Sequence, residues 1–159
     1  MASRMHRRDV APPTPDANGI GVSESIPVEP TAAGLEAARA FVRDTLTKWT
    51  LQPAVSNAVL DIAHELVSNA VQHATAPITL ELLLEPARVR VIVRDASEAP
   101  VRRLPYRAGV SEHGLGIRLV AQLSTMWGQQ LEAQGKSVWA VVNRRTRAER
   151  AAPQVRRGE

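Results

Sequence analysis

Two adjacent runs of alternating apolar and polar residues, at 78–84 and 88–95, constrain the fold of this chain most strongly. An alternation with a period of two is typical of strands that bury one face, and the turn Glu85-Pro86-Ala87-Arg88 joins the two runs. The residues expected to face the core are Ile78, Leu80, Leu82, Leu84, Val89, Val91 and Val93. The arginines of the second run are expected mostly on the opposite face.

Two segments before these strands have the spacing of amphipathic helices. Residues 31–51 form the first, with Thr31 as its N-cap, and residues 53–74 form the second, with Pro53 in its first turn. Their apolar faces are Leu35, Ala38, Val42, Leu46 and Trp49 on the first helix, and Val55, Val59, Ile62, Leu66 and Ala70 on the second.

The remaining elements follow a loop at 96–113. A third helix is predicted from about Gly114 to Gly128, because Leu115, Leu119, Leu123 and Met126 have helical spacing. Strands at 131–134 and 137–142 are predicted to close the fold as a hairpin around Gly135-Lys136.

This order of elements predicts an α/β two-layer sandwich, in which a mixed or antiparallel sheet carries helices on one face. A strand at about 22–28 is expected at the edge of the sheet, because Pro27 cannot occupy a central strand. We therefore expect one domain at 22–143, between disordered tails at 1–21 and 144–159.

The composition excludes several classes of protein. The chain has no cysteine, which excludes disulfide scaffolds, cysteine-ligated zinc or iron–sulfur sites and thiol nucleophiles. The net charge of +4 is concentrated in residues 144–159, which hold six arginines against two glutamates, so we expect no direct binding of nucleic acid. No apolar run is long enough for a membrane span and the N-terminus lacks the apolar segment of a secretory leader, so a cytoplasmic location is expected.

Polar residues of the second helix lie at the border of its apolar face. With Glu65 at 0° on the helical wheel, Asn69 falls at about 40° and His73 at about 80°, beside apolar residues at about 60° to 120°. Burial of a carboxylate and an amide costs several kcal/mol unless something binds them. For each residue alone, a hydrated position at the border is the simpler interpretation.

Two further features strengthen the case for a ligand site. Asp95 ends the second strand with the same parity as its core valines, so it is expected on the side of the helices. Gly114-Leu115-Gly116 opens the third helix, where glycines let backbone N–H groups approach an anion and the helix dipole favours phosphate. Either feature alone is weak, but in this order, after Glu65 and Asn69, they form a fairly specific combination.

Other nucleotide and metal motifs do not fit. Gly135-Lys136-Ser137 resembles the end of a P-loop, but it lacks the preceding glycine and a strand follows it. Gly114-Leu115-Gly116 lacks the third glycine of a dinucleotide fingerprint, since Leu119 stands there. His64-Glu65 lacks the second histidine of a zinc protease helix, since Ser68 stands there.

On these motifs the chain resembles a GHKL-type ATPase domain with the Bergerat fold, over roughly residues 31–143. It is most similar to the short anti-sigma-factor kinases common in actinobacteria. The matching motifs are Glu65–His73 for the N box, Val91–Asp95 for the strand leading into the G1 box, His113–Val120 for the G2 box and Gly135–Ala140 for the closing strand.

The resemblance implies roles for these residues in binding Mg²⁺ and ATP. Asn69 would coordinate Mg²⁺ between the phosphates, with His73 in the same cofactor site, and Glu65 would polarise the attacking hydroxyl as the catalytic residue. Asp95 would accept a hydrogen bond from the adenine amino group, and Ser137 would support the same edge of the base. Backbone N–H groups of Gly114, Leu115 and Gly116 would bind phosphate.

The resemblance also implies that residues 96–113 form a lid, from which Arg102, Arg103, Arg107 or His113 would reach the γ-phosphate. The run Asp95-Ala-Ser-Glu-Ala-Pro100 lacks the glycines that usually follow the G1-box aspartate. Side chains there would narrow the adenine pocket or stiffen the lid, which affects nucleotide affinity rather than the fold.

The function implied is that of an anti-sigma factor with serine/threonine kinase activity toward an anti-sigma factor antagonist. Partners would be the antagonist, a sigma factor or both, and members of this group commonly form homodimers, with Arg39 and Arg43 as candidate contacts on the first helix. Two alternatives remain open: a non-catalytic, ATP-dependent binding module, and a histidine-kinase-like ATPase domain.

Overall fold

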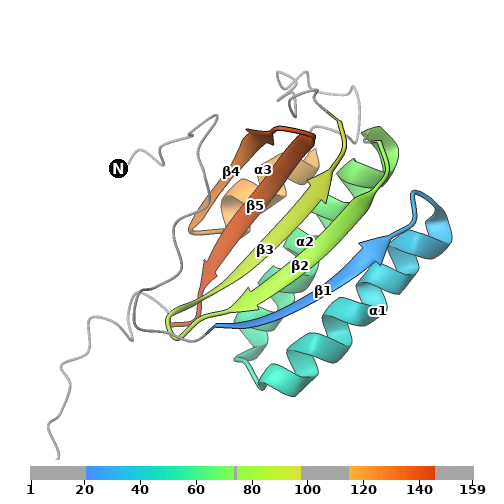
Figure 1. Ribbon diagram of the computed structural model, residues 1–159. Coiled ribbons are helices and arrows are strands. Elements are labelled where there is room, and N and C mark those ends of the chain that lie inside the picture. The colour runs from blue at the N-terminus through green and yellow to red at the C-terminus, as the bar shows by residue number, and fades with distance from the viewer. Residues whose placement is uncertain (1–20, 74, 98–114, 146–159) are drawn as a thin grey trace, which may run out of the picture.

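The computed structural model describes residues 21–73, 75–97 and 115–145. A five-stranded antiparallel sheet runs in the order β1-β2-β3-β5-β4, with three helices packed on one face (Figure 1). The elements are β1 (Val22–Val28), α1 (Ala32–Trp49), α2 (Pro53–His73), β2 (Ile78–Leu84), β3 (Arg88–Asp95), α3 (Leu115–Leu123), β4 (Met126–Glu132) and β5 (Gly135–Asn143). The predicted α/β sandwich is confirmed, with β1 at the edge of the sheet. Residues 1–20 and 146–159 of the predicted tails lie outside the described residues.

Local capping sets the ends of the first helix. The Thr31 hydroxyl accepts a hydrogen bond from the Gly34 N–H at 3.1 Å, which satisfies one of the donors left free at the start of α1. Thr50 takes a left-handed conformation, with φ at 48°, and ends the helix. Pro53 is the first residue of α2, where the missing N–H of proline has no cost to the helix.

The strand register places the predicted apolar residues in one layer. Leu80 pairs with Val93, and Val93 in turn pairs with Val138 on the other side of β3. These residues are buried against the helices, as are the predicted core residues Ile78, Leu82, Val89 and Val91. The core therefore lies between the sheet and the faces of α1, α2 and α3.

The third helix is shorter than predicted. It ends at Leu123 rather than at Gly128, and Met126 begins β4 instead of extending the helix. The N–H of Thr125 donates to the Val141 carbonyl at 2.7 Å, so the chain has joined the sheet at that point. Gly128 faces Trp139 across the strand pair, where a Cβ would lie 2.8 Å from the indole ring.

The closing hairpin is correspondingly longer than predicted. Its strands extend over 126–132 and 135–143, in place of 131–134 and 137–142. The predicted turn around Gly135-Lys136 moves back by two residues to Ala133-Gln134, and Gly135 opens β5 with a φ of 132°. Glycine adopts such a backbone without steric cost, so Gly135 can begin a strand immediately after the tight turn.

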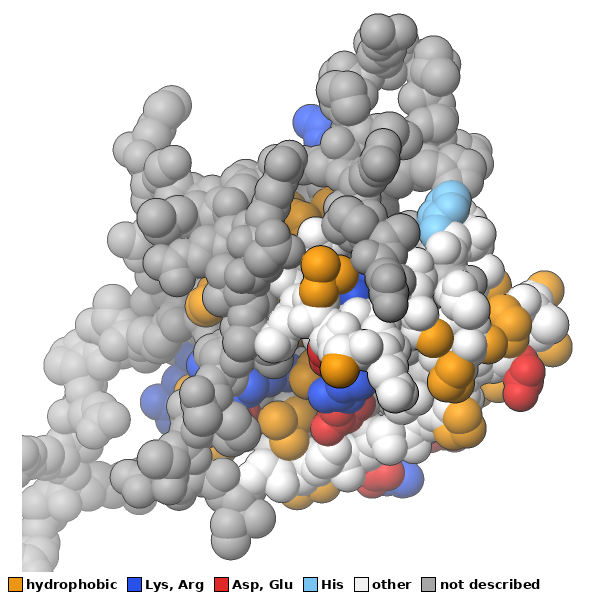
Figure 2. All heavy atoms as spheres, turned by 45° about the horizontal axis from the view of Figure 1, so that its top comes forward, with side chains coloured by type: hydrophobic (Ala, Val, Ile, Leu, Met, Phe, Trp, Pro, Cys, Tyr) orange, Lys and Arg blue, Asp and Glu red, His pale blue; other side chains and the backbone are white. Residues whose placement is uncertain are grey.

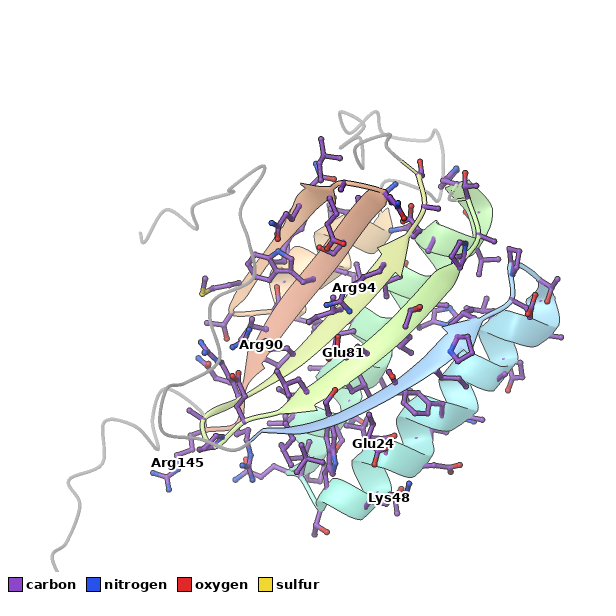
Figure 3. The ribbon with its side chains drawn as sticks, in the orientation of Figure 1. Glu24, Lys48, Glu81, Arg90, Arg94 and Arg145 are labelled. Carbon is purple, nitrogen blue, oxygen red and sulfur yellow. The ribbon has the colours of Figure 1, made fainter. Side chains whose placement is uncertain are left out.

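The sheet face away from the helices is not simply a solvated arginine face. Ile92, Trp139 and Val141 form a second buried apolar cluster there. Arg90 faces the predicted side but is only 3% exposed. Its guanidinium donates to both carboxylate oxygens of Glu85, at 2.8 and 2.6 Å, and Figure 3 shows Arg90 on this face of the sheet.

Glu85 connects the β2–β3 turn to this face. It accepts hydrogen bonds from Arg88 at 2.6 Å as well as from Arg90, and it is 2% exposed. Burial alone would raise the pKa of Glu85, but the hydrogen bonds from Arg90 and Arg88, with the positive charges of both, outweigh burial and hold this pKa below its ordinary value. The carboxylate is therefore the charged partner that lets Arg90 be buried.

No described helix is sufficiently long and apolar to cross a membrane.

Candidate nucleotide site

Four elements end or begin together at one end of the sheet. β3 ends there at Asp95, and its partner β5 begins there at Gly135. β2 starts at the same end, since Thr79 pairs with Arg94, so α2 must finish nearby. β4 also runs toward this end. α3 precedes β4, runs in the opposite direction and is joined to it by a short link, so α3 begins near this end (Figure 1). We call this region the Asp95 end of the sheet.

Asp95 is the buried acid at this end. It is 6% exposed, and its Oδ1 atom accepts a hydrogen bond from the Ser97 N–H at 2.8 Å. The Lys136 ammonium lies 3.5 Å from the same oxygen. Among the described residues, none donates a hydrogen bond to Oδ2 of Asp95. The carboxylate is thus oriented through one oxygen, and the other can accept a donor from a ligand.

The connection after α2 is joined to Asp95 through the backbone. The N–H of Ala96 donates to the Thr75 carbonyl at 2.9 Å. This bond fixes the end of β3 against the segment between α2 and β2. The end of β3, with Asp95, is therefore joined to the segment that follows α2.

The helical-wheel prediction for α2 agrees with the structure for Glu65 and Asn69 but not for His73. Glu65 and Asn69 are partly buried, and His73 is exposed at the last position of the helix. The Asn69 Nδ2 atom is buried and has no hydrogen-bond partner among the residues that the structure describes. A buried donor without an acceptor lowers the stability of the ligand-free protein by about 1–3 kcal/mol. Because Nδ2 is a hydrogen-bond donor, an acceptor such as a phosphate oxygen would satisfy it.

The residues present fit Mg²⁺ bound together with a nucleotide. Within the described ranges, no group of three or more His, Asp or Glu side chains could hold a metal by itself. Mg²⁺ is commonly held by one or two protein oxygens together with substrate phosphates. The Asn69 side chain can supply such an oxygen, and a phosphate supplies the remaining ligands.

The glycine-rich start of α3 is described only in part. The helix begins at Leu115, and its first N–H groups have no partner within the helix, as at any helix start. Gly114 and the predicted lid residues Arg102, Arg103, Arg107 and His113 lie outside the described residues. Of the lid at 96–113, the structure describes only Ala96 and Ser97. Leu115 and Gly116 belong to the first turn of α3, which begins near the Asp95 end.

Ser137 does not lie beside Asp95. The register pairs Ser137 with Arg94 and pairs Lys136 with Asp95. Because side chains alternate between the faces of a sheet, Ser137 projects from the face opposite to Asp95. The side chain next to Asp95 is that of Lys136, which the motif comparison missed. The alternation of Val138 and Ala140 into the core, extended back by one step, identifies Lys136 as a residue of the inner face.

The charge distribution around this end is mixed. Figure 2 brings the Asp95 end forward, and on the described part of that surface acidic and basic side chains are interspersed.

Comparison with known proteins agrees with this geometry. Residues 28–142 match the family described as histidine kinase-like ATPase domain. A search of curated proteins gave no match. Among solved structures, the chain is similar to the crystal structure of the RsbU and RsbW domains of Rv1364c from Mycobacterium tuberculosis, with a TM-score of 0.60 and 18% identity. The match covers 79% of this chain and 33% of that one, so this chain spans about a third of the solved chain's length.

At 18% identity, the structural similarity is a similarity of fold alone. The family match extends from Val28, the last residue of β1, to Val142, the penultimate residue of β5, and so includes every described residue of the site. This chain belongs to the histidine kinase-like ATPase domain family.

Proposed function

We propose that this protein binds Mg²⁺ and ATP at the Asp95 end of the sheet and acts as an anti-sigma factor with serine/threonine kinase activity. The observation that carries the proposal is the convergence of three incomplete groups at one place. Among the described residues, Oδ2 of Asp95 receives no hydrogen bond, Nδ2 of Asn69 is buried without a partner, and the first N–H groups of α3 have no partner within the helix. Adenine would donate to Asp95, and phosphate oxygens would accept from the Asn69 amide and from the start of α3, while Mg²⁺ would bind the amide oxygen of Asn69.

Each residue has a distinct task in this proposal. Asp95 accepts a hydrogen bond from the exocyclic amino group of adenine, and the backbone of Leu115 and Gly116 donates to phosphate. Asn69 holds the cation, which neutralises charge on the phosphates. His73, exposed at the end of α2, lies at the rim of the site.

Glu65 is the proposed catalytic residue. It precedes Asn69 by one helical turn and is partly buried at the border of the core, so it faces the same region. It accepts the proton of a partner's serine or threonine hydroxyl as that oxygen bonds to the γ-phosphorus and the bond to ADP breaks. The products are a phosphorylated partner and ADP.

The partners proposed are a sigma factor and a small antagonist protein that carries the acceptor hydroxyl. The resemblance of the N, G1 and G2 motifs to anti-sigma-factor kinases supports this choice. We also propose a homodimer with contacts from α1, where Arg43 is exposed and Arg39 is half-buried. A cytoplasmic location accompanies this function.

The test is phosphotransfer from radiolabelled ATP to candidate antagonists from the same genome. The wild type is expected to label a serine or threonine of one antagonist. Glu65→Gln should bind ATP as before and transfer at least 100-fold more slowly, because an amide cannot accept the hydroxyl proton. The matched control is Asp61→Asn, which changes an exposed carboxylate one turn earlier on α2 and should transfer normally.

Other outcomes identify the alternatives. Label on a histidine would support a histidine-kinase-like domain. ATP-dependent binding of a partner without any transfer would support a non-catalytic module. Transfer by Glu65→Gln at the wild-type rate would contradict the role given to Glu65.

A further inference from the structure

Lys136 is an unusual residue at the Asp95 end because a lysine is rarely buried. It is 6% exposed, whereas Lys48, the other lysine of the chain, is exposed on α1. Lysine is almost never fully buried unless it is paired. Here the pairing partner is Asp95, directly opposite in the register of β3 and β5.

The contacts of Asp95 divide its carboxylate into two halves. Both the Ser97 N–H and the Lys136 ammonium approach Oδ1, at 2.8 and 3.5 Å. Oδ2 has no hydrogen-bond donor among the described residues. An open acceptor, Oδ2, therefore lies beside a cationic donor, the ammonium of Lys136. A lysine ammonium has three N–H donors and can serve Asp95 and a second acceptor at the same time.

A base edge that presents a donor next to an acceptor matches this pair. Adenine has such an edge, with its 6-amino group beside the N1 acceptor. Guanine presents the opposite order, because O6 is an acceptor and N1 carries a proton. A guanine in the same position would set an acceptor against the carboxylate and a donor against the ammonium.

We propose that Lys136 is a specificity-determining residue that donates a hydrogen bond to N1 of adenine while it stays paired with Oδ1 of Asp95. This inference rests on the proposed nucleotide function and adds a second point of recognition to it. The base is then selected by two adjacent side chains of opposite charge, one from β3 and one from β5.

The test measures binding of ADP and of 1-deaza-ADP, which keeps the amino group but replaces N1 with C–H. Calorimetry in the presence of Mg²⁺ would be performed on the wild type, on Lys136→Met and on the control Lys48→Met. The wild type should bind ADP at least tenfold more tightly than 1-deaza-ADP. Lys136→Met should lose at least tenfold in affinity for ADP and less than threefold for 1-deaza-ADP, since the analogue has no acceptor for the ammonium.

The control Lys48→Met should bind both nucleotides as the wild type does. The proposal is overturned if Lys136→Met binds ADP with unchanged or higher affinity, or if it loses equally for both nucleotides. If Lys136→Met does not fold, the wild-type comparison decides, since equal affinity for ADP and 1-deaza-ADP overturns the proposal. A wild type that binds no adenine nucleotide overturns the proposed function as well, whereas the other failures leave that function intact.

Discussion

Gly135 lies against the backbone of Asp95 so closely that a Cβ at position 135 would be 2.0 Å from the Asp95 carbonyl oxygen. The same atom would lie 2.8 Å from Cα of Ala96. No side chain can occupy that space unless the backbone of β3 or β5 moves. This contact fixes the end of β3, and with it the position of the Asp95 carboxylate.

Gly135→Ala is expected to destabilise the protein by at least about 2 kcal/mol, because it combines the backbone contact with a positive φ that alanine rarely adopts. Urea denaturation measures the loss. The exposed neighbour Gln134 provides the control, since Gln134→Ala should change the free energy of unfolding by less than about 0.5 kcal/mol. Equal stability of Gly135→Ala and the wild type would contradict the close approach.

Asn69→Leu is expected to separate stability from function. It removes the unsatisfied buried amide, so the unfolding free energy of the nucleotide-free protein should rise by about 1 kcal/mol. The thermal stabilisation by Mg²⁺ and ATP should disappear, because no amide remains to hold the cation. Thermal melts with and without nucleotide measure both effects.

The matched control for that variant is Asn57→Leu, which makes the same change at an exposed position of α2. It should preserve the nucleotide-dependent shift and gain only a few tenths of a kcal/mol from helix propensity. A full nucleotide-dependent shift in Asn69→Leu would show that Asn69 is a structural residue.

The pairing of Glu85 with Arg90 predicts a pH-dependent stability. Because the pKa of Glu85 is lower in the folded protein than in the unfolded chain, its contribution to the free energy of unfolding is fully present above its ordinary pKa of 4.5. That contribution is lost as the pH falls through the lower folded pKa. Glu85→Gln should therefore lower the free energy of unfolding by about 3 kcal/mol at pH 7, and this difference from the wild type should shrink below about pH 4.5.

Urea denaturation at pH 7, 5 and 3.5 tests this expectation. The control is Glu81→Gln on the same face of the sheet, where the Arg94 partner is 42% exposed (Figure 3). It should cost less than about 1 kcal/mol at pH 7, because solvent screens an exposed ion pair. If the difference in unfolding free energy between Glu85→Gln and the wild type stays constant over this pH range, the lowered pKa of Glu85 is contradicted.

Most of the fold could be predicted because its signals are local. The alternation of Leu80 and Leu82 with polar residues, and the helical spacing around Asn69, need no knowledge of distant contacts. The end of α3 could not be predicted in this way. Met126 follows Leu123 at helical spacing, and only the long-range hydrogen bond from Thr125 to Val141 shows that the chain has entered the sheet.

The positions of the candidate site residues could be predicted only in part. The helical period alone predicts the border positions of Glu65 and Asn69, and the strand alternation predicts the inward direction of Asp95. The structure agrees with all three positions. Ser137 came from motif resemblance, which ignores strand parity, and it lies on the wrong face. The burial of Arg90 also could not be predicted, since it depends on a glutamate that belongs to the preceding turn.

The central claim is that Asp95 recognises adenine, and calorimetry of Mg²⁺-dependent ATP and GTP binding tests it most directly. The wild type should bind ATP at least tenfold more tightly than GTP, because O6 of guanine would face the carboxylate. Asp95→Asn should weaken ATP binding at least tenfold while the variant still unfolds cooperatively. Equal affinity of the wild type for ATP and GTP, or unchanged ATP affinity in Asp95→Asn, would contradict the account.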